Sequence, residues 1–182
     1  MAASLSTPAL TIEEFDRLYG GETPAYEYWD GVAIQKPLPT VLHSLLQFVL
    51  QALLKQKGLA AAAEVRIKVN PTKEPVPDVI AGHRPRAPYP TEPMCIVVEV
   101  LSPSDTVQRI RRKCRFYAAQ QIPGIYVFDP EDRTAERWSE ADNALLPVTA
   151  IEIPGETPLP VSEIWAALDE EVKRWDFEGS QA

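Results

Sequence analysis

The chain has 182 residues, which is enough for one domain with a substantial core and too few for two ordinary domains. Its apolar content of 45% and charged content of 24% are those of a soluble globular protein, and no apolar run is long enough to span a membrane. The net charge of −8 argues against broad, non-specific nucleic-acid binding, although residues 109–115 hold five basic side chains. We expect one domain over residues 1–175 and a disordered tail at 176–182.

The N-terminus lacks the basic region of a secretory signal, so we expect a cytoplasmic protein. Cys95 and Cys114 have no CxxC spacing, and in the cytoplasm they are expected to be reduced core residues rather than a disulfide or a metal pair.

The first predicted elements are a short helix, a hairpin and a longer helix. Thr11 and Glu14 have the spacing of a capping box, which opens the first helix. Asp30-Gly31 predicts a hairpin turn, because type I′ turns need positive φ at both central residues. From residue 40 to 57 leucines recur at helical spacing, and Gly58 is the expected terminator.

The next part of the chain is predicted to form strands. Residues 63–69 alternate apolar with charged side chains, as a strand with one wet face does, and 76–80 is a short strand that carries a proline. Residues 96–101 form an apolar run typical of a central strand buried on both faces.

The C-terminal half continues with a helix, three strands and a last helix. These elements are expected at residues 105–121, 124–129, 133–138, 145–151 and 162–175, with Ser102 to Asp105 capping the first of the helices. The order predicts an α/β fold in which a mixed central sheet is flanked by helices.

Glu99 interrupts the apolar central strand. A carboxylate buried there is costly unless a metal ion, a cation or a proton offsets its charge. On the following helix Ile110, Lys113 and Tyr117 are spaced i, i+3, i+7, so a lysine lies on an apolar stripe. Glu99 and Lys113 are therefore expected to meet.

Asp78 is a second acid on a predicted strand. If its strand neighbours the central one, Asp78 and Glu99 converge. Paired carboxylates make an oxygen-rich site that suits Mg²⁺ or Mn²⁺, and a nearby lysine stabilises developing negative charge or helps to deprotonate water. This combination fits the hydrolysis of a phosphodiester.

The chain resembles the Uma-two family of putative restriction endonucleases, within the PD-(D/E)XK nuclease superfamily. The resemblance is carried by Pro77-Asp78, by Glu99 in VVEVLSPS and by Lys113 in RRKCRFYA. It extends from TIEEF through YEYWDG to GIYVFDP, and VEVLSPS is its most specific element.

The resemblance implies a restriction-endonuclease-like fold and a Mg²⁺-dependent endonuclease, with Mn²⁺ as the alternative ion and DNA as substrate, RNA being left open. Asp78 and Glu99 are implied as metal ligands. Lys113 takes the role that the wider superfamily gives to a residue at the position of Leu101. Glu27 is implied as an auxiliary acid and His43 as a supporting residue near the site. A homodimer is expected, because symmetric pairs cut both strands of a duplex.

The chain departs from the family at Arg109, where an acid is common. Two interpretations stay open: Asp105 compensates, or the metal site is altered.

Each residue also has a simpler structural interpretation. Glu99 could be neutralised by Arg66, and Lys113 could reach out to solvent. Asp78 could be a turn residue, Glu27 an exposed cross-strand partner and His43 a surface or capping residue.

Two other functions compete with that of a nuclease. The first is an inactive module that keeps the nuclease fold and binds nucleic acid or a protein. The second is a homo-oligomeric structural protein, suggested only by Trp138 and Trp175, which are expected to be exposed.

Overall fold

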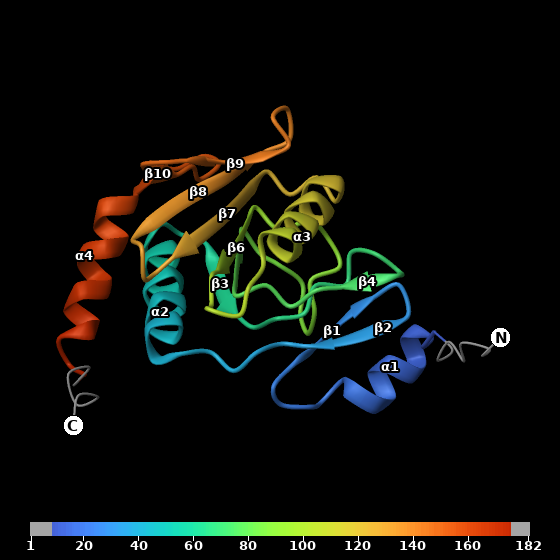
Figure 1. Ribbon diagram of the computed structural model, residues 1–182. Coiled ribbons are helices and arrows are strands. Elements are labelled where there is room, and N and C mark those ends of the chain that lie inside the picture. The colour runs from blue at the N-terminus through green and yellow to red at the C-terminus, as the bar shows by residue number, and fades with distance from the viewer. Residues whose placement is uncertain (1–8, 176–182) are drawn as a thin grey trace, which may run out of the picture.

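A six-stranded mixed sheet organises the computed structural model, which describes residues 9–175 (Figure 1). The strand order is β3-β5-β6-β7-β8-β9, and only β6 and β7 run parallel, because a helix crosses over between them. The strands are Ala60–Ala63 (β3), Val79–Gly82 (β5), Ile96–Val100 (β6), Gly124–Asp129 (β7), Thr134–Ser139 (β8) and Ala144–Pro147 (β9). The tail predicted at 176–182 lies outside the described residues.

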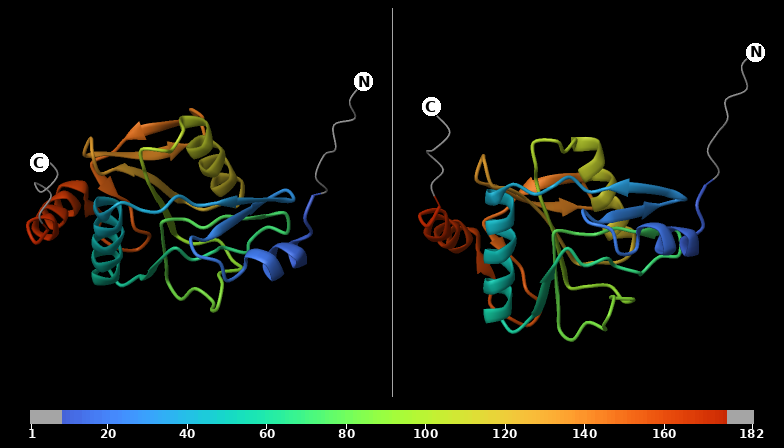
Figure 2. Two further views of the ribbon diagram at one scale, coloured as in Figure 1. Left: turned by 60° about the horizontal axis from the view of Figure 1, so that its bottom comes forward. Right: turned by 90° about the horizontal axis from the view of Figure 1, so that it is seen from below.

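Helices cover both faces of this sheet. The helices α2 (Val41–Gln56) and α4 (Val161–Val172) pack side by side on one face, and α3 (Val107–Ala119) covers the other (Figures 1 and 2). Consecutive residues of β6 alternate between the faces: Val98 packs on the α2 side and Val97 on the α3 side. The predicted mixed sheet between helices is confirmed. No helix among residues 9–175 is long and apolar enough to cross a bilayer.

A smaller sheet with the order β2-β1-β4 lies beside the main one. Its strands are Tyr26–Trp29 (β1), Val32–Gln35 (β2) and Lys73–Glu74 (β4), and α1 (Ile12–Tyr19) packs against it (Figure 2). Asp30 and Gly31 have φ of 49° and 88°, so the predicted hairpin turn is confirmed. The strands β10 (Ala150–Ile151) and β11 (Leu159–Pro160) form a separate two-stranded ribbon.

Side chains cap three of the helices. The predicted capping box of Thr11 and Glu14 is present, and Thr40 caps α2. For α3 the prediction is displaced: the helix begins at Val107 and its N-cap is Thr106. Asp105 instead closes the preceding turn, where it accepts a hydrogen bond from the Ser102 amide at 2.9 Å.

The strand predicted at 63–69 is wrong. The strand β3 ends at Ala63, Glu64 has a positive φ of 54°, and an irregular segment follows. Arg66 and Lys68 both contact Asp16 of α1, and Glu64 contacts Lys36, so the alternating charges reflect ion pairing with distant residues rather than a wet strand face. The expected exposure of Trp138 is also wrong, since it is 7% exposed in the core beneath α3.

Candidate active site

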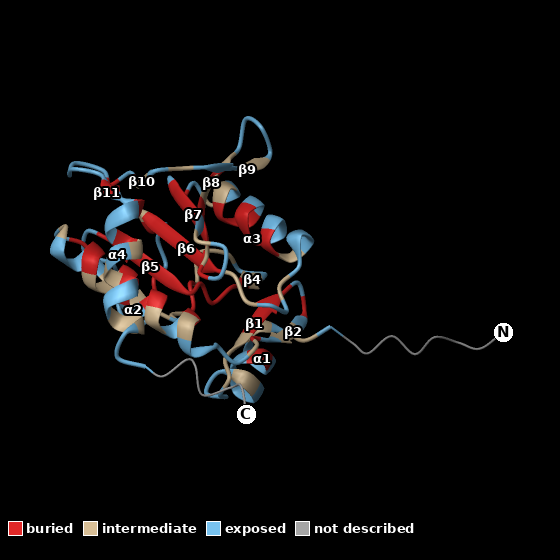
Figure 3. Ribbon diagram, turned by 60° about the vertical axis from the view of Figure 1, so that its left-hand side comes forward, coloured by how far each residue is buried: buried red, intermediate tan, exposed pale blue. Residues whose placement is uncertain are grey.

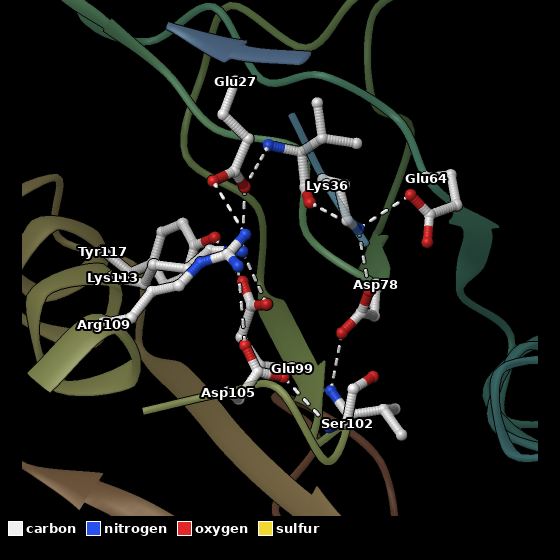
Figure 4. Close-up of polar contacts among 12 residues, drawn as sticks. Glu27, Lys36, Glu64, Asp78, Glu99, Ser102, Asp105, Arg109, Lys113 and Tyr117 are labelled. Atoms are coloured by element: carbon white, nitrogen blue, oxygen red, sulfur yellow. Dashed lines mark hydrogen bonds and ion pairs between the residues drawn. The ribbon is translucent and has the colours of Figure 1, made fainter. Parts of the chain in front are cut away.

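Glu99 and Lys113 meet in the core between β6 and α3. Glu99 lies on the α3 side of its strand, and Lys113 lies on the buried stripe of α3 and is 2% exposed. The Lys113 Nζ lies 2.6 Å from Oε2 of Glu99, and the Tyr117 hydroxyl donates to Oε1 at 2.5 Å (Figure 4). The amine is therefore not in solvent, and it is Lys113 rather than Arg66 that pairs with Glu99.

Glu27 joins the same cluster from β1 of the small sheet. It is fully buried, and its Oε1 lies 2.9 Å from Lys113 Nζ. The Val76 amide and the indole of Trp29 donate to its two oxygens at 3.1 and 3.2 Å. We call Glu27, Glu99, Lys113 and Tyr117 the Lys113 cluster. The exposed cross-strand role considered for Glu27 is wrong.

Asp78 lies directly before β5, beside Glu99. The antiparallel register pairs Val79 with Val98, so Asp78 and Glu99 are the next opposed positions and their side chains emerge on one face. The Asp78 carboxylate accepts from the Val100 amide at 2.7 Å and is 4% exposed. The predicted convergence of the two acids therefore has a structural cause in the strand register.

Lys36 is a site residue that sequence reasoning missed. It follows β2 and is 8% exposed, and its Nζ donates to Asp78 Oδ1 at 2.8 Å, Glu64 Oε2 at 2.7 Å and the Val76 carbonyl at 3.0 Å (Figure 4). A single lysine before a proline-rich segment carries no periodicity that would have indicated burial. We call Lys36, Glu64 and Asp78, with Gln47, the Lys36 cluster.

Gln47 supports this cluster from α2. Its Nε2 donates to Glu64 Oε1 at 2.7 Å and to the Asp78 carbonyl at 3.3 Å. The signal was available in the sequence, because Gln47 shares a helix face with the buried Leu50 and Leu54 at i, i+3 and i+7.

His43, implied by the family as a supporting residue, and Asp105, considered as compensation for Arg109, both reach the site. His43 is 4% exposed, and its Nε2 lies 3.1 Å from the Val100 carbonyl and 3.5 Å from Asp78 Oδ2. It is therefore neither a surface nor a capping side chain. Asp105 lies 3.7 Å from Arg109, whose guanidinium also lies 3.7 Å from Glu27.

The two clusters border one small cavity of about 20 Å³, which has room for about one water molecule. Its lining includes Asp78, Glu99, both lysines, His43 and Arg109. A larger cleft of about 580 Å³ adjoins it and shares Ser102, Asp105 and Ile110 with the cavity wall. The buried charges are thus next to a larger cleft.

Negative charge exceeds positive charge in the combined clusters, which hold four carboxylates and two lysines. The pKa of Glu99 is raised to about 7, mainly by burial. The charge of Lys113 lowers this pKa, and the negative charges of Asp78 and Glu27 raise it. Burial acts likewise on Asp78, but the charges of Lys36 and His43 outweigh it and hold its pKa below the ordinary value. The two acids therefore differ in proton affinity.

The donor set fits a hard divalent cation in chemistry and in charge. Each carboxylate oxygen can accept two hydrogen bonds, and each Glu99 oxygen has one protein donor, so acceptor capacity remains toward the cavity. Over residues 9–175 no group of three or more His, Cys, Asp or Glu side chains is arranged to hold an ion by itself. An ion bound here therefore needs water or substrate oxygens as further ligands, as Mg²⁺ commonly does.

The mixed sheet between helices, with Glu99 on β6 and Asp78 directly before the neighbouring β5, is that of the restriction-endonuclease-like class of folds. A solved structure supports this class: a putative nuclease belonging to DUF820 from Anabaena variabilis ATCC 29413, with a TM-score of 0.67 and 20% identity over 87% of this chain and 99% of that one. The chain belongs to the Uma2 family, described as putative restriction endonucleases, which it matches over residues 12–169. No curated protein matches the chain.

Proposed function

We propose that this protein is a divalent-cation-dependent endonuclease that hydrolyses DNA phosphodiester bonds, with Asp78, Glu99, Lys113 and Glu27 as its catalytic residues. One observation carries the proposal: an acid directly before β5, an acid on the adjacent strand β6 and a buried lysine from the next helix line a single cavity. Membership of a family described as putative restriction endonucleases supports a nucleic-acid substrate.

The residues divide the chemistry between them. Asp78 and Glu99 would hold the cation, Mg²⁺ or Mn²⁺, which would supply a water of lowered pKa and neutralise phosphate charge. Lys113 orients the attacking water and stabilises the negative charge that develops on the phosphate. Glu27 keeps Lys113 protonated and in place, since its carboxylate lies 2.9 Å from the amine.

The test is cleavage of supercoiled plasmid, linear duplex, single-stranded DNA and RNA, each with Mg²⁺, Mn²⁺ or EDTA. The proposal expects metal-dependent cleavage that falls at least about 100-fold in Asp78→Asn and Glu99→Gln. Glu74→Gln is the matched control, because Glu74 is another buried carboxylate, paired with Lys68 outside the site. Absence of cleavage of every substrate by the folded parent protein with either ion overturns the proposal.

A second candidate function is an inactive nuclease-fold module that binds nucleic acid or a protein. Two ion pairs favour it: the Lys36 ammonium pairs with Asp78 in the place of a metal ion, and the Arg109 guanidinium lies beside Glu27. Metal titration separates the two functions: a nuclease should gain thermal stability with Mn²⁺ in a manner that requires Glu99, and an inactive module should not. The expected homodimer stays a prediction that light scattering can test.

A further inference from the structure

The solvent face of α3 carries the strongest unassigned charge feature of the described chain. Gln108, Arg111, Arg112 and Arg115 are all exposed on this face, and the helix contains no acidic residue. The exposed face of α3 is pale blue in Figure 3, opposite the buried stripe that holds Lys113. Such a face attracts a polyanion although the whole chain has a net charge of −8.

Arg111, Arg112 and Arg115 form no close ion pair among the residues that the structure describes. Within residues 9–175 no Asp or Glu oxygen lies within 4 Å of Arg111, Arg112 or Arg115, whereas most other lysines and arginines are in ion pairs. This face therefore carries positive charge without a close ion pair, although the charge of Arg112 interacts with the Asp30 carboxylate.

Neutral contacts hold two of the guanidinium groups in place. The Arg112 guanidinium lies over the ring of Trp29, 4.6 Å from its centroid, and Arg115 Nε donates to Asn143 Oδ1 at 2.9 Å. These contacts restrict the side chains but leave the charge and the terminal nitrogens available. Arginine forks of this kind match phosphate oxygens in geometry, and less entropy is lost when the side chain is already ordered.

The position of this face relative to the site is suited to a substrate backbone. Arg109, on the same helix, lines the cavity, and at 1.5 Å per residue Arg115 lies about 9 Å further along the axis. The larger cleft next to the cavity is lined by Arg111 of this face together with the carboxylates of Glu131, Asp132 and Glu136. Arg111 therefore belongs both to the solvent face of α3 and to the wall of the cleft that adjoins the cavity.

We infer that the solvent face of α3, through Arg111, Arg112 and Arg115, binds the phosphate backbone of the nucleic acid whose bond is cut in the adjacent cavity. This inference rests on the proposed function for the identity of the ligand. The contacts are to phosphates, so they contribute affinity and register but no sequence preference.

The test measures duplex binding in EDTA as a function of salt, in a Glu99→Gln background so that nothing is cleaved. The test variant carries Arg111→Gln, Arg112→Gln and Arg115→Gln, since glutamine is a good helix former and these positions are exposed. The control carries Arg17→Gln, Lys55→Gln and Arg84→Gln, three exposed residues away from α3 with the same loss of charge. A DNA duplex and an RNA duplex are run in parallel to identify the preferred backbone.

We expect the control to keep the salt dependence of the parent. In the α3 variant, a plot of the logarithm of the binding constant against the logarithm of the salt concentration should be less steep by about three, because each lost phosphate contact lowers the slope by about 0.9. Equal slopes for the α3 variant and the control overturn the inference, as does absence of binding by the parent at low salt. Salt-dependent binding that needs α3, in a protein that cuts nothing with any ion, would sink the proposed function alone. Metal-dependent cleavage with α3-independent binding would sink only the present inference.

Discussion

The Lys36 ammonium lies 2.8 Å from Oδ1 of Asp78, across 42 positions of sequence and between two different sheets. Lys36 also donates to Glu64, so one lysine joins two carboxylates where a bound cation would otherwise be able to join them. An internal ammonium and an external ion therefore compete for the same oxygens, and this competition leads to the first prediction.

Lys36→Met should increase the affinity of the protein for Mn²⁺ by about tenfold or more, which corresponds to about 1.4 kcal/mol. Methionine keeps much of the volume but leaves Asp78 and Glu64 without their shared cation. The measurement is thermal stabilisation across a Mn²⁺ titration, with Lys68→Met as a control lysine paired outside the site. Equal Mn²⁺ responses of Lys36→Met and the parent would contradict the competition.

Lys113→Met should lower the free energy of unfolding by about 3–5 kcal/mol, because it leaves Glu27 and Glu99 buried without their cation. Urea denaturation at neutral pH is the measurement. Lys68→Met again serves as the control, and its partly exposed ion pairs should contribute about 1 kcal/mol or less. Combining Lys113→Met with Glu99→Gln should recover part of the loss. A single-variant cost below about 1 kcal/mol would show that the pair is dispensable.

Stability without metal should fall as the pH rises from about 5 toward 7. The pKa of Glu99 is raised to about 7 in the folded state, so the folded protein holds a proton that the unfolded chain releases near its ordinary value of 4.5. The stabilisation is therefore complete below the pKa of Glu99 in the unfolded chain. It is lost as the pH rises through the pKa of Glu99 in the folded protein. Urea denaturation in EDTA across this range should show a decline on the order of 3 kcal/mol. Glu99→Gln should flatten the decline, and an unchanged slope in that variant would assign it to another group.

Tyr117→Phe should cost about 1.5–3 kcal/mol, because its hydroxyl donates at 2.5 Å to the buried Glu99 carboxylate. Tyr126→Phe is the matched control: that hydroxyl accepts from the Glu152 amide at 2.8 Å, a neutral hydrogen bond of about 1 kcal/mol. Thermal melts of both variants would compare them directly. The assignment fails if the Tyr126 variant loses as much stability as the Tyr117 variant.

Local patterns predicted several elements because the physics behind them is local. The capping box of Thr11 and Glu14 and the positive φ of Asp30-Gly31 involve only neighbouring residues. The burial of Lys113 followed from helical spacing, since Ile110 and Tyr117 share its stripe. The false strand at 63–69 shows the limit of pattern reasoning. There the alternating charges pair with Asp16 on α1 and with Lys36, neither of which lies in the same sequence window.

The sequence by itself determined the family, the sheet between helices and three of the residues that line the cavity, Asp78, Glu99 and Lys113. Only the tertiary structure decided what surrounds each charge. The Lys36 cluster depends on contacts between residues tens of positions apart; helical spacing indicated that Gln47 is buried, but no periodicity indicated its partners or the burial of Lys36. Burial makes each such pairing decisive, because a charge removed from water is stabilised only by the partners that the fold places beside it.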